Sequence, residues 1–243
     1  MALTDAVEIP RRTMVLFFVV DTSGSMTGSK LGAVNTAIEE VIPAIKEISD
    51  ENADAQIKIA ALEFSSGAHW ITQNGPMELD QFHWNDLQAA GVTDLGEACK
   101  ALNEKLSTKA FMKEATGSFA PAIFLLSDGE PTDNWQSGLG ILKQNNWFKT
   151  AVKVAVAIGD DANKDVLAEF TGTKEAVLEV HNAAALKKMI KFVSVRASQV
   201  ASKSSNAGAA DSGDEQKQAE LNANLKELKE DLAASPDNDQ EDW

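Results

Sequence analysis

The stretch MVLFFVVDTSGSM, residues 14–26, decides the fold class of this chain. An uninterrupted apolar run rich in Val and Phe covers residues 14–20, and it ends at Asp21. Runs of this kind are typical of strands buried on both faces, which occur mainly in parallel sheets. Such sheets bind their ligands at the carboxyl ends of the strands, usually near a switch point in strand order. The sequence therefore predicts a functional site at Asp21.

Hydroxyl side chains follow Asp21 at alternate positions. Ser23 and Ser25 alternate with Thr22 and Gly24, so two hydroxyls can turn toward one point while Gly24 allows a tight backbone path. Carboxylate and hydroxyl oxygens are hard ligands, which suit Mg²⁺, Mn²⁺ or Ca²⁺ rather than zinc or copper. A purely structural role stays open for this segment alone, because Asp and Ser are also ordinary residues of turns and helix caps.

The pattern Asp-x-Ser-x-Ser resembles the metal-ion-dependent adhesion site of von Willebrand factor A domains. In that family a threonine from a later loop and an aspartate at a further strand end complete the metal shell. Both have counterparts here. The segment GVTDLG, residues 91–96, offers Thr93 ahead of a helical run, and the buried run IFLLSDG, residues 123–129, contains Asp128.

The resemblance implies a division of roles among these residues. Ser23, Ser25 and Thr93 would bind the metal through their hydroxyls, and Asp21 and Asp128 would hold it largely through water. Neutral direct ligands leave the ion electrophilic, and Mg²⁺ gives up its waters reluctantly. The implied function is protein binding, in which an open metal position accepts an Asp or Glu of a partner.

Strand and helix patterns alternate along the chain. Apolar residues at helical spacing cover residues 31–45, with Pro43 as a kink or weak point. We expect strands at 57–64, 122–127, 152–158 and 176–180, an antiparallel partner at 68–72, and helices at 95–107, 138–149 and 183–199. This order predicts an α/β, Rossmann-like fold: a doubly wound, mostly parallel sheet flanked by helices, with one short antiparallel edge strand.

Composition restricts the partners. The 243 residues carry a formal net charge of −15, which argues against nonspecific nucleic-acid binding. No apolar run is long enough to span a bilayer, and no secretory signal segment precedes residue 14. With Cys99 as its only cysteine, the chain forms no internal disulfide. The expectation is a cytoplasmic protein, with Cys99 buried in a helix.

A narrower resemblance comes from two segments together. FVVDTSGSM, residues 18–26, and LSDGEPTD, residues 126–133, are similar to the bacterial TerY-type branch of this superfamily. The similarity covers roughly residues 12–200. That branch is linked to tellurium resistance and stress response, so the resemblance implies an adaptor that works with a Ser/Thr kinase and a PP2C-type phosphatase.

The carboxyl-terminal part differs in composition. We divide the chain into an N-terminal extension (1–11), the main domain (12–200), a Ser/Ala/Gly-rich linker (201–213) and an acidic tail (214–243). Residues 201–243 hold 4 lysines against 11 acidic residues. Leucines at 221, 225, 228 and 232 predict a short amphipathic helix. It either docks on its own domain, folds on a partner, or belongs to a solubilising tail.

Residues around the proposed site have simpler expected roles. Asp133, or Asn134 beside it, is expected to cap a helix that begins at Trp135, and Asp94 is expected to cap its own helix. Glu130 is the other nearby acid, and metal binding is the alternative role for both Glu130 and Asp133. Trp84 and Trp135 flank the site and offer an apolar rim for a partner. The three histidines lack cysteine companions, so a zinc site is not expected.

The alternative function is enzymatic. An aspartate at a strand tip with Mg²⁺ nearby also suits a phosphotransferase or hydrolase that uses Asp21 as nucleophile. However, the haloacid-dehalogenase-like pattern requires a second aspartate where this chain has Ser23. No Gly-x-x-x-x-Gly-Lys loop is present to bind nucleotide phosphates. We therefore predict no catalysis.

Overall fold

The computed structural model describes residues 11–53, 55–113, 117–201 and 212–233. Helices and strands alternate through most of this length, and η marks a 3₁₀ turn. Their order is β1 (Arg12–Asp21), η1 (Gly24–Met26), α1 (Ser29–Glu51), β2 (Ala55–Ser65), β3 (Gly67–Trp70), β4 (Met77–Glu78), α2 (Leu95–Lys105), β5 (Ala122–Ser127), α3 (Trp135–Leu142), α4 (Asn146–Thr150), β6 (Val152–Ile158), α5 (Lys164–Thr171), η2 (Lys174–Ala176), β7 (Val177–Val180), α6 (Ala183–Ala201) and α7 (Ser212–Ala233).

The strands form one mostly parallel sheet. Their order is β3-β2-β1-β5-β6-β7, and β4 pairs with β2 beside this path. β3 and β4 run antiparallel to β2, and the other neighbouring strands are parallel. The predicted fold class is confirmed. β4 is a second antiparallel strand that the sequence analysis did not predict, because two residues are too few to show an alternating pattern.

Strand order reverses at β1. From β1 the chain continues to β2 on one side and later returns to β5 on the other side. Parallel pairing sets Val20 opposite Leu126, so Asp21 and Asp128 leave the sheet at the same edge. This is the switch point at which open α/β sheets bind their ligands.

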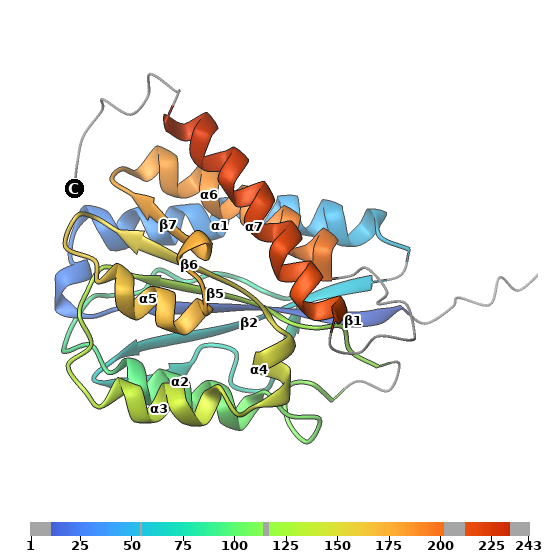
Figure 1. The fold of residues 1–243 in the computed structure, drawn as a ribbon, viewed down its shortest axis with the longest axis horizontal. Coiled ribbons are helices and arrows are strands. Elements are labelled where there is room, and N and C mark those ends of the chain that lie inside the picture. The colour runs from blue at the N-terminus through green and yellow to red at the C-terminus, as the bar shows by residue number, and fades with distance from the viewer. Residues whose placement is uncertain (1–10, 54, 114–116, 202–211, 234–243) are drawn as a thin grey trace, which may run out of the picture.

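Helices cover both faces of the sheet (Figure 1). α1, α6 and α7 lie over one face, and α2, α3, α4 and α5 over the other. Each face of the sheet packs against its helices in a separate hydrophobic core, and β1 contributes fully buried side chains to both cores. Met14, Leu16, Phe18 and Val20 belong to the first core, and Val15, Phe17 and Val19 to the second. The unbroken apolar run therefore reflects a central strand that has no solvent-facing side.

Two predicted helices differ from the structure. α1 continues past Pro43 to Glu51, so the proline does not end it. The predicted helix at 138–149 is wrong, since α3 and α4 occupy this segment as two separate helices. Asn145 separates them: its Oδ1 accepts from the backbone N–H groups of Trp147 and Phe148 and so caps α4. A side chain that caps the second helix favours a break before it.

α5 is a helix that the sequence analysis did not predict. Asn163 caps its start by accepting from the N–H of Val166, and Gly172, with φ of 88°, ends it in the left-handed region. Both are standard helix-boundary signals, and the segment is short.

The leucine stripe near the carboxyl terminus docks α7 on its own domain. Leu221 and Leu225 are fully buried and Leu228 nearly so, in the same core as α6 and β6. Of the three roles considered for this segment, the structure thus favours docking in cis. The side chain of Leu232 and residues 202–211 of the predicted linker lie outside what the structure describes. The proposed domain boundaries remain predictions.

A side-chain amide of α7 completes the edge of β6. β7 pairs only with residues 155–158 of β6. Beside the earlier part of β6, Gln218 Oε1 accepts from the Lys153 N–H at 3.0 Å, and Gln218 Nε2 donates to the Lys153 carbonyl at 3.2 Å. A neighbouring strand would bond these same two backbone groups. α7 thus covers a strand edge that β7 does not reach.

Chemical denaturation will test the docking of α7. Replacing the fully buried Leu225 by Ala is expected to lower the free energy of unfolding by about 2–5 kcal/mol, because it leaves a cavity in the core. The control is Lys226→Ala, an exposed position in the same helix, with an expected change within about 0.5 kcal/mol. Equally small changes in both variants would show that α7 does not pack on the domain in solution.

Candidate functional site

Two buried aspartates lie at the switch point. Asp21 ends β1 and Asp128 follows β5, and their exposed fractions are 0% and 1%. The Asp21 carboxylate accepts from the Ser23 N–H at 2.8 Å through Oδ1, and from Ser127 Oγ at 2.6 Å through Oδ2. Both carboxylate oxygens of Asp21 therefore have donors within the protein.

The hydroxyls of the first loop connect the two aspartates. Ser23 Oγ and Ser25 Oγ are 3.0 Å apart, and Ser25 Oγ donates to Asp128 Oδ1 at 2.7 Å. The other oxygen of Asp128, Oδ2, binds Lys30 Nζ at 2.5 Å. The predicted residues Ser23, Ser25 and Asp128 therefore form one hydrogen-bonded chain.

Thr93 reaches the same place from the loop before α2. Its N–H donates to Thr132 Oγ1 at 3.0 Å, and its carbonyl accepts from the Thr132 N–H at 2.8 Å. Thr93 is buried, with an exposed fraction of 6%. The loop that carries it is therefore bonded directly to the loop that follows Asp128.

Gly129 marks the space that these side chains surround. A Cβ added at Gly129 would lie 3.5 Å from both Ser25 Oγ and Thr93 Oγ1, and 4.0 Å from Asp21 Oδ2. Three oxygens from three separate segments thus face the one position where glycine has no side chain. The structure brings together all five predicted residues: Asp21, Ser23, Ser25, Thr93 and Asp128.

Backbone contacts hold the loops in this arrangement. The Thr22 N–H donates to the Phe64 carbonyl at 2.8 Å, and the Ala90 N–H donates to the Thr22 carbonyl at 2.8 Å. The Gly24 N–H donates to the Gly91 carbonyl at 3.1 Å, an approach so close that a Cβ at Gly24 would lie 3.3 Å from that oxygen. These bonds fix the first loop against the loop that carries Thr93.

Burial governs the electrostatics of Asp21. Desolvation raises the pKa of the Asp21 carboxyl above its ordinary value, hydrogen bonds from Ser127 and Ser23 lower it, and the charge of Asp128 raises it. The net direction is upward, so the ionised form is costly in this site. A cation beside Asp21 would favour that ionised form.

The acids flanking the site make structural bonds. Asp133 accepts from the N–H groups of Gly96 and Glu97 and so caps α2, while Asn134 caps α3. The expectation that Asp94 caps its own helix by its side chain is wrong. Its carboxylate instead accepts from the Gly67 N–H at 2.8 Å and so holds the turn between β2 and β3.

The predicted aromatic rim is largely part of the core. Trp84 and Trp135 are only partly exposed and pack against opposite cores of the sheet. Val92, directly before Thr93, has an exposed fraction of 47%, which makes it an exposed apolar side chain next to the site. Sequence reasoning missed it because exposure of a loop valine has no sequence signal.

Two further site residues were missed by sequence reasoning. Ser127 binds Asp21, and Lys30 binds Asp128, across 106 and 98 residues of sequence respectively. Ser127 has a weak signal, since it stands beside Asp128 at the end of a buried strand. Lys30 has none, because a lysine in the first turn of a helix is ordinarily solvated.

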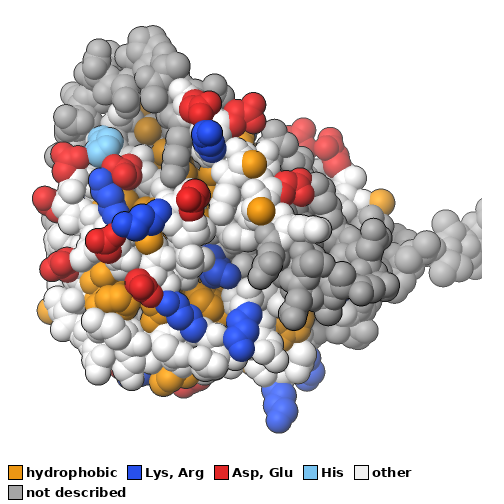
Figure 2. All heavy atoms as spheres, in the orientation of Figure 1, with side chains coloured by type: hydrophobic (Ala, Val, Ile, Leu, Met, Phe, Trp, Pro, Cys, Tyr) orange, Lys and Arg blue, Asp and Glu red, His pale blue; other side chains and the backbone are white. Residues whose placement is uncertain are grey.

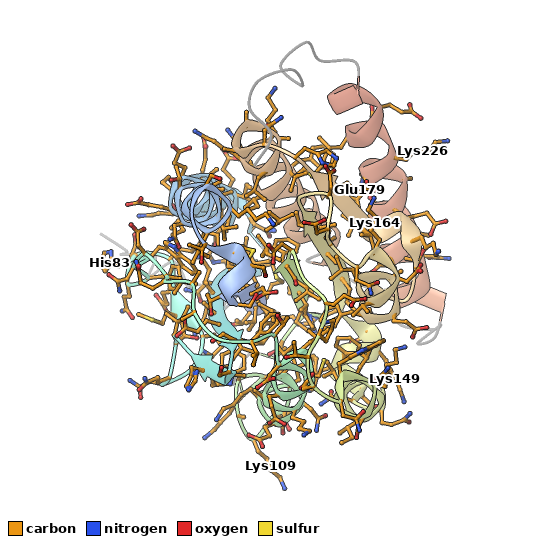
Figure 3. All side chains as sticks on the ribbon, turned by 90° about the vertical axis from the view of Figure 1, so that its left-hand side faces the viewer. His83, Lys109, Lys149, Lys164, Glu179 and Lys226 are labelled. Carbon is orange, nitrogen blue, oxygen red and sulfur yellow. The ribbon has the colours of Figure 1, made fainter. Side chains whose placement is uncertain are left out.

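The view along the carboxyl ends of the strands shows other charged residues around this side of the molecule (Figure 3). Lys164 and Glu179, labelled there, form an ion pair at 2.6 Å and help line a surface hollow of about 450 Å³. Lys174, also in this hollow, pairs with Asp165 at 2.9 Å. Its lysines are thus engaged by carboxylates, and it offers no comparable convergence of oxygen ligands.

Comparison with known proteins agrees with this architecture. The family model for the von Willebrand factor type A domain matches residues 16–192. The chain belongs to this family. A comparison with curated proteins gave no match. Domains of the von Willebrand factor A family are generally interaction modules rather than enzymes, often dependent on a metal.

Solved structures share this von Willebrand factor A fold. A type A protein from Catenulispora acidiphila has a TM-score of 0.56 at 16% identity, covering 76% of this chain and 43% of its own. Proximal thread matrix protein 1 from the mussel byssus, with a zinc-occupied MIDAS motif, has a TM-score of 0.56 at 14% identity, covering 77% and 48%. The pilus adhesin SpaC from Lactobacillus rhamnosus GG has a TM-score of 0.59 at 14% identity, covering 76% and 30%.

This chain spans less than half of each of these three proteins. At such identities the likeness establishes the fold alone. Among the residues that the structure describes, no group of three or more His, Cys, Asp or Glu side chains is placed to hold a metal. The candidate site described above instead brings together two carboxylates and three hydroxyls. Within the same ranges, no helix is both long and apolar enough to cross a bilayer.

Asn35 of α1 holds the long segment between β4 and α2. Its Oδ1 accepts from Trp84 Nε1 at 3.1 Å and from the Leu87 N–H at 3.0 Å, and its Nδ2 donates to the Leu87 carbonyl at 3.1 Å. Asn35 is 6% exposed, so these bonds are shielded from water. The segment that they hold leads directly to Thr93.

Replacing Asn35 by Ala is expected to loosen this segment. The loss of three partly buried hydrogen bonds is expected to lower the free energy of unfolding by about 1–3 kcal/mol, and to increase protease cleavage between residues 79 and 92. Thr36→Ala, at the adjacent exposed position of α1, is the control, with an expected change within about 0.5 kcal/mol. Unchanged cleavage in the Asn35 variant would contradict this positioning role.

Proposed function

We propose that this domain binds a protein partner through a divalent cation, Mg²⁺ in the first instance. Its ligands would be Asp21, Ser23, Ser25, Thr93 and Asp128. An Asp or Glu side chain of the partner would occupy the open coordination position. The observation that carries this proposal is the convergence of oxygens from three loops on the space beside Gly129.

The donor set fits such an ion. Carboxylate and hydroxyl oxygens suit hard cations, with Mn²⁺ and Ca²⁺ as the other candidates. The zinc-occupied site of the mussel protein supports a divalent cation in this fold without deciding which ion binds here. When bound, the ion would supply a Lewis-acidic position for a carboxylate. The chain's own residues would hold its shell, with the three hydroxyls as direct ligands and the two aspartates acting largely through water, and would present Val92 to the partner.

The enzymatic alternative gains no support from the geometry. Asp21 is fully buried, and both of its carboxylate oxygens accept hydrogen bonds. A nucleophile has to reach its substrate, which Asp21 does not do in this arrangement. The open position at Gly129 suits ligation by a partner better than attack by Asp21.

The cellular setting rests on the sequence resemblance. The TerY-type segments support a cytoplasmic adaptor in a bacterial tellurite-resistance or stress-response system, together with a Ser/Thr kinase and a PP2C-type phosphatase. The acidic composition supports protein rather than nucleic-acid partners. On the face drawn in Figure 2, acidic and basic side chains are mixed over the upper and left parts, and basic side chains gather toward the lower edge.

Calorimetric titration of Mg²⁺ and Mn²⁺ into metal-stripped protein tests the proposal. Wild type is expected to bind with a saturable heat, and Asp21→Asn and Gly129→Ala are expected to bind at least about tenfold more weakly. The distances around Gly129 are ordinary contact distances for a methyl group, so Gly129→Ala should fold while filling space that faces the ligand oxygens.

Gly140→Ala is the matched control. A Cβ there meets nothing within 4 Å, so it tests the same substitution in α3, away from the site, and should leave metal binding unchanged. Circular dichroism and thermal unfolding would show that all variants are folded. A wild type with no saturable binding of either ion would overturn the proposed function.

A further inference from the structure

Lys30 places an ammonium group within the candidate site. Its Nζ lies 2.5 Å from Asp128 Oδ2, and the exposed fractions of the two side chains are 17% and 0%. Among the described residues, Asp21 has no Lys, Arg or His within ion-pair distance. The protein thus neutralises one of its two buried carboxylates and leaves the other with hydrogen bonds alone.

Lys30 and the hydroxyls use different oxygens of Asp128. Oδ1 accepts from Ser25 Oγ at 2.7 Å, and Oδ2 accepts from Lys30 Nζ. Because Ser25 is linked in turn to Ser23, Oδ1 is the oxygen of Asp128 that belongs to the hydroxyl cluster. The ammonium group therefore need not leave when a cation joins the hydroxyl cluster.

The charges then favour a particular ligand. Two ionised aspartates and Lys30 give the cluster a net charge of −1, which attracts a divalent cation less strongly than two unpaired carboxylates would. Once a divalent cation is added, the net charge becomes +1. One partner carboxylate restores neutrality, whereas without Lys30 the metal alone would do so.

We infer that Lys30 is a specificity-determining residue of this site: it weakens metal binding in the free domain and makes the loaded site selective for an anionic carboxylate of the partner. This inference rests on the proposed function. The inference specifies the charge of the partner's group and not only its oxygen atom. A neutral carbonyl or hydroxyl would leave the metal-loaded cluster with one excess positive charge.

Calorimetric titration of Mg²⁺ into metal-stripped wild type, Lys30→Met and Lys30→Gln tests this role. Both variants remove the charge, and the Gln side chain keeps a hydrogen-bond donor. The expected result is Mg²⁺ binding about tenfold tighter in both variants than in wild type, from the removal of one repulsive charge. Replacing chloride by acetate at equal ionic strength is expected to tighten Mg²⁺ binding in wild type more than in either variant.

Lys46→Met is the matched control. Lys46 lies in the same helix and pairs with an exposed carboxylate, that of Asp80. It stands about 24 Å further along α1, at 1.5 Å per residue, beyond a Debye length of about 10 Å at 0.1 M salt. The control therefore changes the total charge equally and should leave Mg²⁺ affinity as in wild type.

Thermal unfolding gives a second readout. Without metal, both Lys30 variants are expected to melt below wild type, because Asp128 loses its buried ion-pair partner. Mg²⁺ is expected to raise their melting temperatures by more than it raises that of wild type.

The outcomes separate the two proposals. Saturable Mg²⁺ binding in wild type with equal or weaker binding in both Lys30 variants would overturn the role of Lys30 and leave the proposed function standing. An equal acetate effect in all proteins would overturn the selectivity for carboxylate. Absence of binding in wild type and in every variant would overturn the proposed function, and this inference with it.

Discussion

The parallel pairing of β1 with β5 places two carboxylates, Asp21 and Asp128, next to each other in the protein interior. Burying one carboxylate is costly, and burying a second beside it adds repulsion. Hydrogen bonds and an ion pair from the surrounding residues offset part of this free-energy cost. Ser127 and the Ser23 N–H donate to Asp21, and Lys30 donates to Asp128. The presence of this costly pair at a switch point supports the proposed cation site.

Contacts within the protein hold the loops around this pair in place. Backbone bonds join Thr22 to Phe64 and Ala90, Gly24 to Gly91, and Thr93 to Thr132. Three chain segments are therefore held in their relative positions by main-chain contacts, together with the side chains of Thr132 and Asp94. Because these contacts already order the proposed ligands, binding of a cation would cost little conformational entropy. Its affinity would then be set mainly by charge. This is why a single lysine is expected to have a measurable effect.

How much of the structure could be predicted from the sequence depends on how far apart in the chain the interacting residues lie. The buried run before Asp21 and the regular helix and strand patterns are local signals, and the mostly parallel, doubly wound sheet that they predict is confirmed. Thr93 and Asp128 were found only through resemblance to a family, because no local rule relates them to Asp21. Lys30, Ser127 and Asn35 were missed, since their roles depend on partners 98, 106 and 49 residues away. Only the fold brings residues so far apart in sequence into contact.

The leucine stripe of α7 shows that sequence also fails to predict where a helix packs. Its periodicity predicted a helix but contained no information about the surface on which it would dock. In the structure α7 lies against β6 at Lys153, near the amino end of that strand, whereas Asp21 and Asp128 lie at the carboxyl ends. The family model ends at residue 192, so α7 lies outside the matched residues. It shields a strand edge and enlarges one core without contributing a residue to the candidate site. Stability gained at one end of the sheet can therefore offset the cost of the buried carboxylates at the other.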